Sequence, residues 1–292
     1  MIPPVTLLLI LGAAILAIAL LRWLALRAFD LLHLGWRTAP RLAGRLGLQR
    51  ARPLWHRVAE RYPRPSAWIA ARLHGGRFTG LPLTLMVVAA AYILSLLGGL
   101  VDALHEAEGI ARIDQAVNDW FAPWRLTPLV EGFVWLTTLG TGAALAGVAV
   151  TATGFLWADR RPGFILPLWV TLIGALSTTW AGKFAIGRPR PEFIEAVTAA
   201  SPSFPSAHST GAMAVLGFCA YAMARDLPPG RGRFEVGFWA AVLIALIGFS
   251  RIFLSVHFLS DVLSGFLVGG FWLLVGFALV EWRRAAGRPP EL

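Results

Sequence analysis

The sequence predicts an all-α fold, a polytopic bundle of membrane-spanning helices, and three observations support this prediction. Hydrophobic residues make up 57% of the 292 residues and charged residues only 14%, against about 25% charged in a typical soluble domain. Seven apolar stretches approach or reach the roughly 20 residues with which a helix crosses a bilayer. The basic residues concentrate on alternate connections between these stretches, as is typical of integral membrane proteins.

The seven candidate spans lie in two of the four domains that the sequence predicts: one in the N-terminal domain and six in the core. The first span lacks a basic n-region and an obvious small-residue cleavage site before Arg22, so we interpret it as a retained membrane helix and not as a cleaved signal peptide. The candidate spans are 2–21, 81–101, 132–158, 163–182, 209–224, 236–250 and 262–280. The predicted domains are an N-terminal transmembrane helix at 1–26, an arginine-rich segment at 27–80, a six-span core at 81–282 and a tail at 283–292.

Two segments between spans have helical patterns but are too polar to cross a membrane. The segment 27–80 contains stretches such as LWHRVAERY, which combine one apolar side with arginines. This pattern indicates short amphipathic helices on the inner membrane surface, with a solvated basic loop as the alternative. In 102–127, apolar residues recur at helical spacing and predict a helix at the membrane interface.

The basic residues also predict the orientation of the spans. With the N-terminus outside, 19 of the 26 lysines and arginines fall on inside segments and six on outside segments, and Arg22 lies at a boundary. The long segment 27–80 dominates this count. We therefore expect a multi-pass protein of a bacterial-type cytoplasmic (inner) membrane. The net charge of +10 then reflects membrane topology, and no nucleic-acid partner is expected.

Ionisable side chains gather at the ends of spans on the predicted outer, periplasmic face. They belong to the stretches KFAIGRPRP (183–191), FPSAHS (204–209) and SRIFLSVHFLSD (250–261). Charged groups at the edge of a span are costly and indicate function, and several cations together indicate a polyanionic ligand. Lys183 is the only lysine in the chain, which favours a need for a compact ammonium donor.

Within the last of these stretches, His257 and Asp261 lie four residues apart and would touch if both were on one helix. A carboxylate on one imidazole nitrogen orients the ring and leaves the other nitrogen free to attack or to accept a proton. Ser250 would share this face in a continuous helix, and a break after Arg251 is the alternative. His208 stands near the expected start of a helix, where free backbone N–H groups favour an anion.

The sequence contains no motif typical of a metal site or of a nucleotide-binding loop. It contains no Cys/His cluster, Asp-rich set or His-Glu-x-x-His pattern near these residues, and no Walker loop for a nucleotide. We therefore expect neither a metal nor another cofactor. The single cysteine, Cys219, excludes an internal disulfide.

Three motifs together resemble the signature of the phosphatidic acid phosphatase type 2 superfamily. That signature is a lysine, six residues and Arg-Pro; then Pro-Ser-Gly-His; then Ser-Arg, five residues, histidine, three residues and aspartate. KFAIGRPRP, PSAH (205–208) and SRIFLSVHFLSD match it in spacing. The one departure is Ala207, where the family usually has glycine. The resemblance covers roughly 81–281, the six-span core.

The resemblance implies a metal-independent phosphatase that forms a phosphohistidine intermediate. It implies that His257 is the nucleophile, that Asp261 orients it, and that His208 protonates the leaving oxygen. Arg188 falls inside the six-residue spacer and receives no role. The groups implied to hold the phosphoryl oxygens are Lys183, Arg190, Ser206, the backbone near Ala207, and Arg251.

A site at the membrane edge suits a lipid phosphate whose headgroup lies at the surface while its acyl or prenyl chain stays in the bilayer. Phosphatidate, phosphatidylglycerophosphate, undecaprenyl pyrophosphate and a lipid A phosphate are all candidate substrates. Two rival functions share parts of the pattern. A lipid phosphotransferase has the same first half-reaction, and an anionic-lipid transporter or binding protein needs the cations but has no use for the His257–Asp261 pair. Neither the oligomeric state nor a role for 27–80 follows from the pattern.

Overall fold

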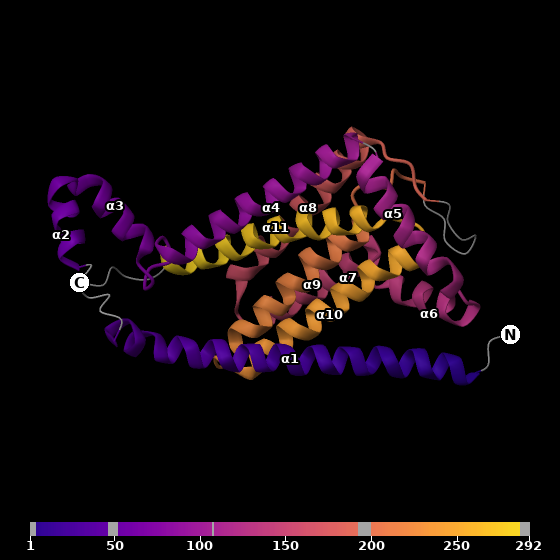
Figure 1. Ribbon diagram of the computed structural model, residues 1–292, viewed down its shortest axis with the longest axis horizontal. Helices are drawn as coiled ribbons and strands as arrows, with labels where there is room; N and C mark the ends of the chain where they lie inside the picture. The colour runs from indigo at the N-terminus through magenta and orange to yellow at the C-terminus, as the bar shows by residue number, and fades with distance from the viewer. Residues whose placement is uncertain (1–3, 46–51, 107, 192–199, 287–292) are drawn as a thin grey trace.

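The computed structural model describes residues 4–45, 52–106, 108–191 and 200–286, and all regular structure in these residues is helical. The helices pack into an elongated bundle (Figure 1), which confirms the predicted all-α fold. Among the described residues, five helices are long and apolar enough to span a membrane, and the bent pair Thr127–Thr138 and Gly142–Ala158 is a sixth candidate. The chain is thus a multi-pass membrane protein.

The N-terminal region is one long helix followed by two short ones. Helix α1 (Pro4–Arg45) passes through the expected domain boundary at residue 26 without a break, and its apolar part is Thr6–Leu32. Helices α2 (Arg52–Arg61) and α3 (Pro63–Leu73) are the short helices expected in the arginine-rich segment. The part of the predicted tail at 287–292 lies outside the described residues.

Helix α9 (Ala207–Asp226) is the central helix of the bundle. It contacts α7 (Gly142–Ala158), α8 (Ile165–Ile186), α10 (Arg231–Phe253) and α11 (Leu259–Ala286). It is less apolar than the helices that qualify as spans, although the sequence predicts a short span here. Because its neighbours shield it, its surface can be less apolar than that of a helix facing lipid. Its Val215 and Phe218 belong to the main apolar cluster.

Glycines bring α11 close to α9. A Cβ atom on Gly265 would lie 2.7 Å from the carbonyl oxygen of Ser206, and one on Gly269 would lie 2.6 Å from that of Thr210. Small residues four apart allow such close packing of membrane helices. As a result the backbone N–H of Ser206 donates to the carbonyl of Asp261 at 2.9 Å, so the starts of the two helices lie side by side.

The candidate span 132–158 is a bent pair of helices and not one continuous helix. It is divided between α6 (Thr127–Thr138) and α7, which meet at a bend of 44°. Thr141 caps the start of α7 by accepting a hydrogen bond from the N–H of Ala144 at 3.3 Å. At the break, a Cβ atom on Gly140 would meet the side chains of Ile247 and His208, so the bend allows a close approach of helices near the candidate site.

The helix expected in 102–127 is present as α5 (Glu108–Phe121), after the span α4 (Leu81–His105). Figure 1 shows α5 and α6 at one end of the bundle and α2 and α3 at the opposite end. The arginine-rich segment therefore lies at the end of the bundle away from α5.

Candidate active site

The candidate residues come together where four helices begin or end, at the α5 end of the bundle. Lys183 lies in the last turn of α8, His208 at the start of α9, Arg251 in the last turn of α10 and Asp261 in the first turn of α11. Residues separated by more than 70 positions thus form one cluster. Burial, and charge repulsion from the nearby residues Arg251, His257, Arg190 and Lys183, lower the pKa of His208.

His257 and Asp261 contact each other, but not as neighbours on one helix. Helix α10 ends at Phe253 and α11 begins at Leu259, so His257 lies in the connection between them. The break after Arg251, which the sequence left open, is therefore present. The Nδ1 atom of His257 lies 3.5 Å from Oδ2 of Asp261, and the two residues are 3% and 0% exposed.

The other ring nitrogen of His257 faces a cation. Nη1 of Arg190 lies 3.1 Å from Nε2 of His257. Because a guanidinium can only donate, Nε2 must accept, and the proton of the neutral ring is on Nδ1. Burial lowers the pKa of His257 to about 4, against the opposing effect of Asp261. The ring is therefore neutral at physiological pH, and Nε2 carries a lone pair that accepts from Arg190.

Arg251 has donor capacity that the described residues do not use. Its side chain is 4% exposed, and Nη1 donates to the hydroxyl of Thr137 at 2.8 Å. Its Nε is buried and has no hydrogen-bond partner among the described residues. A buried donor without an acceptor is costly, so this atom indicates where an anion can bind.

The other two predicted cations are anchored to backbone carbonyls. Lys183 is 1% exposed, and its ammonium donates to the carbonyl of Pro202 at 2.5 Å. Arg190 donates to the carbonyls of Ser201 and Val256, at 2.8 and 2.7 Å. These bonds hold both cations in place, and an ammonium retains further N–H groups for a ligand.

Ser206 caps the start of α9, and its hydroxyl accepts hydrogen bonds from the backbone N–H and the hydroxyl of Ser209. Ala207, at the position where the family usually has glycine, is the first residue of the helix and does not adopt a positive φ. The conformational freedom of glycine is thus not required there. His208 is half-buried, whereas His257 and Arg251 are buried.

Three residues without a role in the sequence motifs contact the site: Arg188, Asp114 and Ser203. Arg188 donates to Asp261 Oδ1 and to Asp114 Oδ2, both at 2.7 Å. Asp114, in α5, is 2% exposed. Ser203 donates to Asp261 Oδ2. Asp114 falls on the apolar side of α5, between Ile110 and Val117, and a carboxylate at such a position is the signal that could have identified it.

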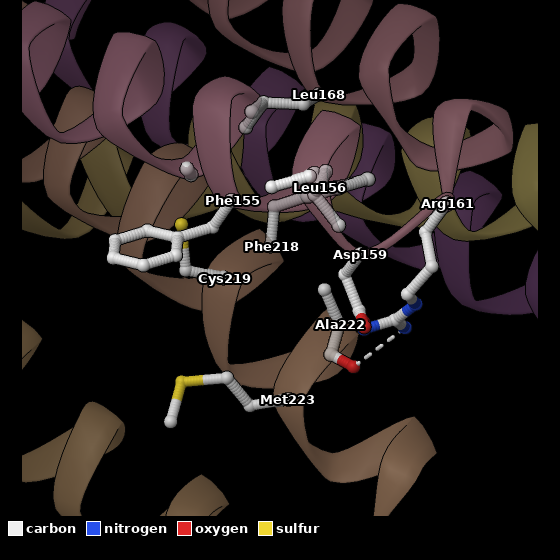
Figure 2. A pocket seen from close by; sticks show the side chains of 11 residues that line it. Phe155, Leu156, Asp159, Arg161, Leu168, Phe218, Cys219, Ala222 and Met223 are labelled. Carbon is white, nitrogen blue, oxygen red and sulfur yellow. Dashed lines mark hydrogen bonds and ion pairs between the residues drawn. The ribbon is translucent and has the colours of Figure 1, made fainter.

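No group of three or more His, Cys, Asp or Glu residues that could hold a metal ion is found in the described residues. A pocket of about 560 Å³ lies between α7, α8 and α9. Figure 2 shows Phe155, Leu168 and Cys219 among the side chains that line it. None of the candidate site residues lines it.

Buried cations around a histidine–aspartate pair, at one end of a membrane helix bundle, define the class of membrane-embedded phosphatases. The chain belongs to the PAP2 superfamily, because the model of that family matches residues 135–285, which include all three motifs. The predicted family is thereby confirmed, and so is the predicted enzyme class of lipid phosphatase.

Similar proteins have also been characterised or solved. Phosphatidylglycerophosphatase B of Bacillus subtilis (strain 168) is 34% identical over 186 residues, which cover 61% of this chain and 89% of that protein. The crystal structure of a transmembrane PAP2-type phosphatidylglycerolphosphate phosphatase from Bacillus subtilis has a TM-score of 0.62 and 28% identity, over 69% of this chain and 98% of that one. Aquifex aeolicus LpxE has a TM-score of 0.47 and 20% identity, over 56% of this chain and 94% of that one.

Proposed function

We propose that this protein hydrolyses a lipid phosphate through a phosphohistidine on Nε2 of His257. The observation that carries the proposal is the 3.1 Å contact of that nitrogen with Nη1 of Arg190. Because a guanidinium only donates, the contact requires an unprotonated Nε2. The buried Nε of Arg251, without a partner among the described residues, supports a phosphoryl group bound beside it. A binding protein for anionic lipids would not need a lone pair aimed into its cation cluster.

In the first half-reaction, Nε2 of His257 attacks phosphorus and the bond to the lipid oxygen breaks. Burial and the neighbouring cations disfavour a protonated His208 in the empty site, and the negative charge of the bound phosphate offsets them. Protonated in this way, His208 donates its proton to the leaving oxygen, which departs as the lipid alcohol. The cations Lys183, Arg190 and Arg251 bind the phosphoryl oxygens, where charge accumulates in the transition state. The helix start at Ser206 and Ala207 adds backbone N–H groups.

In the second half-reaction, water replaces the histidine. His208, now neutral, accepts a proton from water while the water oxygen attacks phosphorus, and the N–P bond breaks. Inorganic phosphate leaves, His257 is neutral again and His208 has regained its proton. One histidine thus serves as acid and then as base, as the reversal of the first step requires.

Two further residues are proposed to position the nucleophile without touching the phosphate. Arg188 and Asp114 form a chain that ends on Oδ1 of Asp261, while Oδ2 of Asp261 contacts the imidazole. The chain fixes the carboxylate, and the carboxylate fixes the tautomer of His257 in which Nε2 carries no proton. Phosphatidylglycerophosphate is the substrate to test first, because the Bacillus subtilis relative carries that activity in its name.

The membrane face and the domain roles are also proposals. The site lies at the end of the bundle away from the arginine-rich segment, and the excess of basic residues on that segment supports a cytoplasmic location for it. We infer that the site opens to the periplasmic side of the inner membrane and that residues 81–282 form the catalytic core.

The test is a trapping experiment with the purified full-length protein in EDTA. A brief reaction with ³²P-labelled phosphatidylglycerophosphate should leave acid-labile, base-stable label on the wild-type protein and none on His257→Ala. Turnover by His257→Ala should fall by at least about 10²-fold, the low end for losing one acid–base or nucleophilic group. His208→Ala should slow turnover most with poor leaving groups.

Thermal melting provides the control for this experiment. Although the sequence places His257 at the end of a span, the residue is buried, so the alanine variant must be shown to fold. A folded His257→Ala protein that keeps more than about 1% of the wild-type rate, or that still becomes labelled, would exclude His257 as the nucleophile. Transfer of label to a second lipid and not to water would indicate a phosphotransferase.

A further inference from the structure

A second polar cavity opens at the end of the bundle away from the candidate active site. Its volume is about 560 Å³, and it lies between the turn after α3, the start of α4 and the ends of α9, α10 and α11 at that side. Three arginines line it, Arg77, Arg225 and Arg233, together with one carboxylate, Glu281. The described lining is therefore strongly cationic.

Glu281 neutralises only one of these arginines. It accepts hydrogen bonds from Arg225 at 2.7 Å and from the hydroxyl of Tyr221. Even so, Nε of Arg225 is buried and has no hydrogen-bond partner among the described residues. Arg233 is anchored at the cavity wall, because its Nε donates to the carbonyl of Leu227 at 2.8 Å. Arg77 is exposed at the cavity rim.

One side of the same cavity is apolar and continues onto a helix surface that faces outward. Phe78, Pro82 and Met86 line it. Helix α4, which contains the last two, has no buried residue in its candidate span. Leu85 is 58% exposed. A ligand with an anionic head and an apolar chain could thus place its head among the arginines and its chain along α4.

We propose that this cavity binds the phosphate headgroup of an anionic glycerophospholipid from the leaflet at the arginine-rich end of the bundle. Basic pockets between membrane helices recognise such headgroups, and the buried Nε of Arg225, which has no partner among the described residues, could donate to a phosphate oxygen. The site is separate from the catalytic cluster, and the proposal does not depend on the reaction. A free phosphate ion would use the arginines but not the apolar wall.

The test compares two double variants of the full-length protein with wild type. Arg77→Gln/Arg233→Gln removes two cavity arginines and leaves the Arg225–Glu281 pair intact. The matched control, Arg64→Gln/Arg283→Gln, removes two exposed arginines outside the cavity. Binding of dioleoylphosphatidylglycerol is measured by native mass spectrometry in detergent, with dioleoylphosphatidylcholine as the zwitterionic comparison. The phosphodiester of dioleoylphosphatidylglycerol carries the anionic headgroup without a terminal phosphate to hydrolyse.

We expect wild type and control to prefer phosphatidylglycerol over phosphatidylcholine, and the cavity variant to bind phosphatidylglycerol about 30-fold more weakly. That figure assumes about a fivefold contribution from each arginine near a membrane surface. Turnover of a short-chain lipid phosphate should be unchanged in both double variants. The melting temperature of wild type should rise with phosphatidylglycerol, but not with inorganic phosphate.

Two results would overturn the proposal. Equal retention of phosphatidylglycerol by the cavity variant and the control would show that the two arginines do not bind the lipid. Inorganic phosphate could instead stabilise wild type as much as phosphatidylglycerol does, and this stabilisation could be lost in the cavity variant. That result would show a site for free anions and exclude the lipid assignment.

Discussion

Asp261 is held on both carboxylate oxygens by groups from different segments. Oδ1 accepts from Arg188 at 2.7 Å, and Oδ2 accepts from the backbone N–H of Phe258 at 2.8 Å and from the hydroxyl of Ser203. Arg188 in turn is held by the buried carboxylate of Asp114. A carboxylate fixed in this way cannot rotate away from the imidazole that it orients.

We predict that Asp114→Asn lowers kcat by about 10- to 100-fold, the scale on which a small misplacement of a reacting group acts. Without the charge of Asp114, Arg188 is released from one of its two carboxylate partners, and the orientation of Asp261 loosens. KM should change little, because Asp114 is not proposed to touch the phosphate. The measurement is steady-state kinetics, with the active fraction determined by the amount of trapped phosphohistidine.

Asp119→Asn is the matched control for this prediction. Asp119 lies on the same helix, is exposed, and accepts a hydrogen bond from Gln115. It should keep wild-type kinetics. Equal kcat values for the two variants per active site, or an Asp114→Asn variant that only melts at a lower temperature, would contradict a positioning role.

The pH profile tests the environment of His257. Its pKa is lowered to about 4, so Nε2 becomes protonated, and activity is lost, only as the pH falls through about 4. A histidine with the ordinary pKa of about 6.5 would already be about nine-tenths protonated at pH 5.5. We therefore expect no loss of kcat/KM between pH 7 and 5.5 from this group.

The substrate itself titrates near pH 6, so its ionisation must be measured separately, for example by ³¹P NMR, and removed from the profile. The profile could instead show that kcat/KM falls as an enzyme group with a pKa near 6.5 becomes protonated. If this pKa is absent from the profile of a His257 variant with residual activity, the group is His257, and burial does not keep its imidazole neutral.

At the scale of elements, α5 holds the connection between α10 and α11 from outside. Asp114 accepts from the backbone N–H of Ser260 at 3.0 Å, and Asn118 accepts from the hydroxyl of Ser255 at 2.8 Å. Arg125, just after α5, donates to the carbonyl of Phe253 at 2.8 Å. Helix α5 precedes the part of the chain that the family model matches, yet it supports the loop that carries His257.

The break between α6 and α7 lies against His208, the second histidine of the candidate site. A Cβ atom on Gly140 would lie 2.5 Å from the side chain of Ile247 and 3.0 Å from Cδ2 of His208. We predict that Gly140→Ala displaces His208, lowers turnover most with poor leaving groups, and costs about 1–3 kcal/mol of stability through overpacking. Turnover and thermal melting measure the two effects.

Gly142→Ala is the control, because a Cβ atom there has no neighbour within 4 Å. It should leave both turnover and stability close to wild type. If Gly140→Ala behaves like Gly142→Ala, the close approach at the break has no role in placing His208.

At the scale of the whole molecule, the two ends of the bundle differ in chemistry. Helix α5 lies at one end of the bundle and α2 and α3 lie at the other (Figure 1). The catalytic candidates belong to the α5 end, and the arginine-lined cavity includes the turn after α3. This polarity agrees with the basic-residue count and supports, under the proposed orientation, a periplasmic active site with the second lipid site in the cytoplasmic leaflet.

Cysteine labelling tests this orientation. In a Cys219→Ala background, Ala111→Cys in α5 should react with a membrane-impermeant maleimide in intact spheroplasts. Glu60→Cys in α2 should react only after lysis. Both positions are exposed, so equal labelling of the two variants after lysis is the control. The reverse pattern would place the active site on the cytoplasmic face.

The sequence alone was sufficient to predict the all-α membrane fold, the family and the residues of the three motifs. Apolar length and motif spacing are properties of residue order, and they hold however the helices are packed. The division of the span 132–158 at Gly140 could not be predicted in this way. It depends on the contacts of Gly140 with Ile247 and His208, which belong to other helices.

Only the tertiary structure decided which groups support the motif residues. The Arg188–Asp114 pair joins residues 74 positions apart, and the arginine-lined cavity combines side chains from the turn after α3 and from α9, α10 and α11. Such contacts depend on how helices are placed against one another. A buried charge gains its stability from the partner it meets there, and neither its own identity nor its spacing specifies that partner.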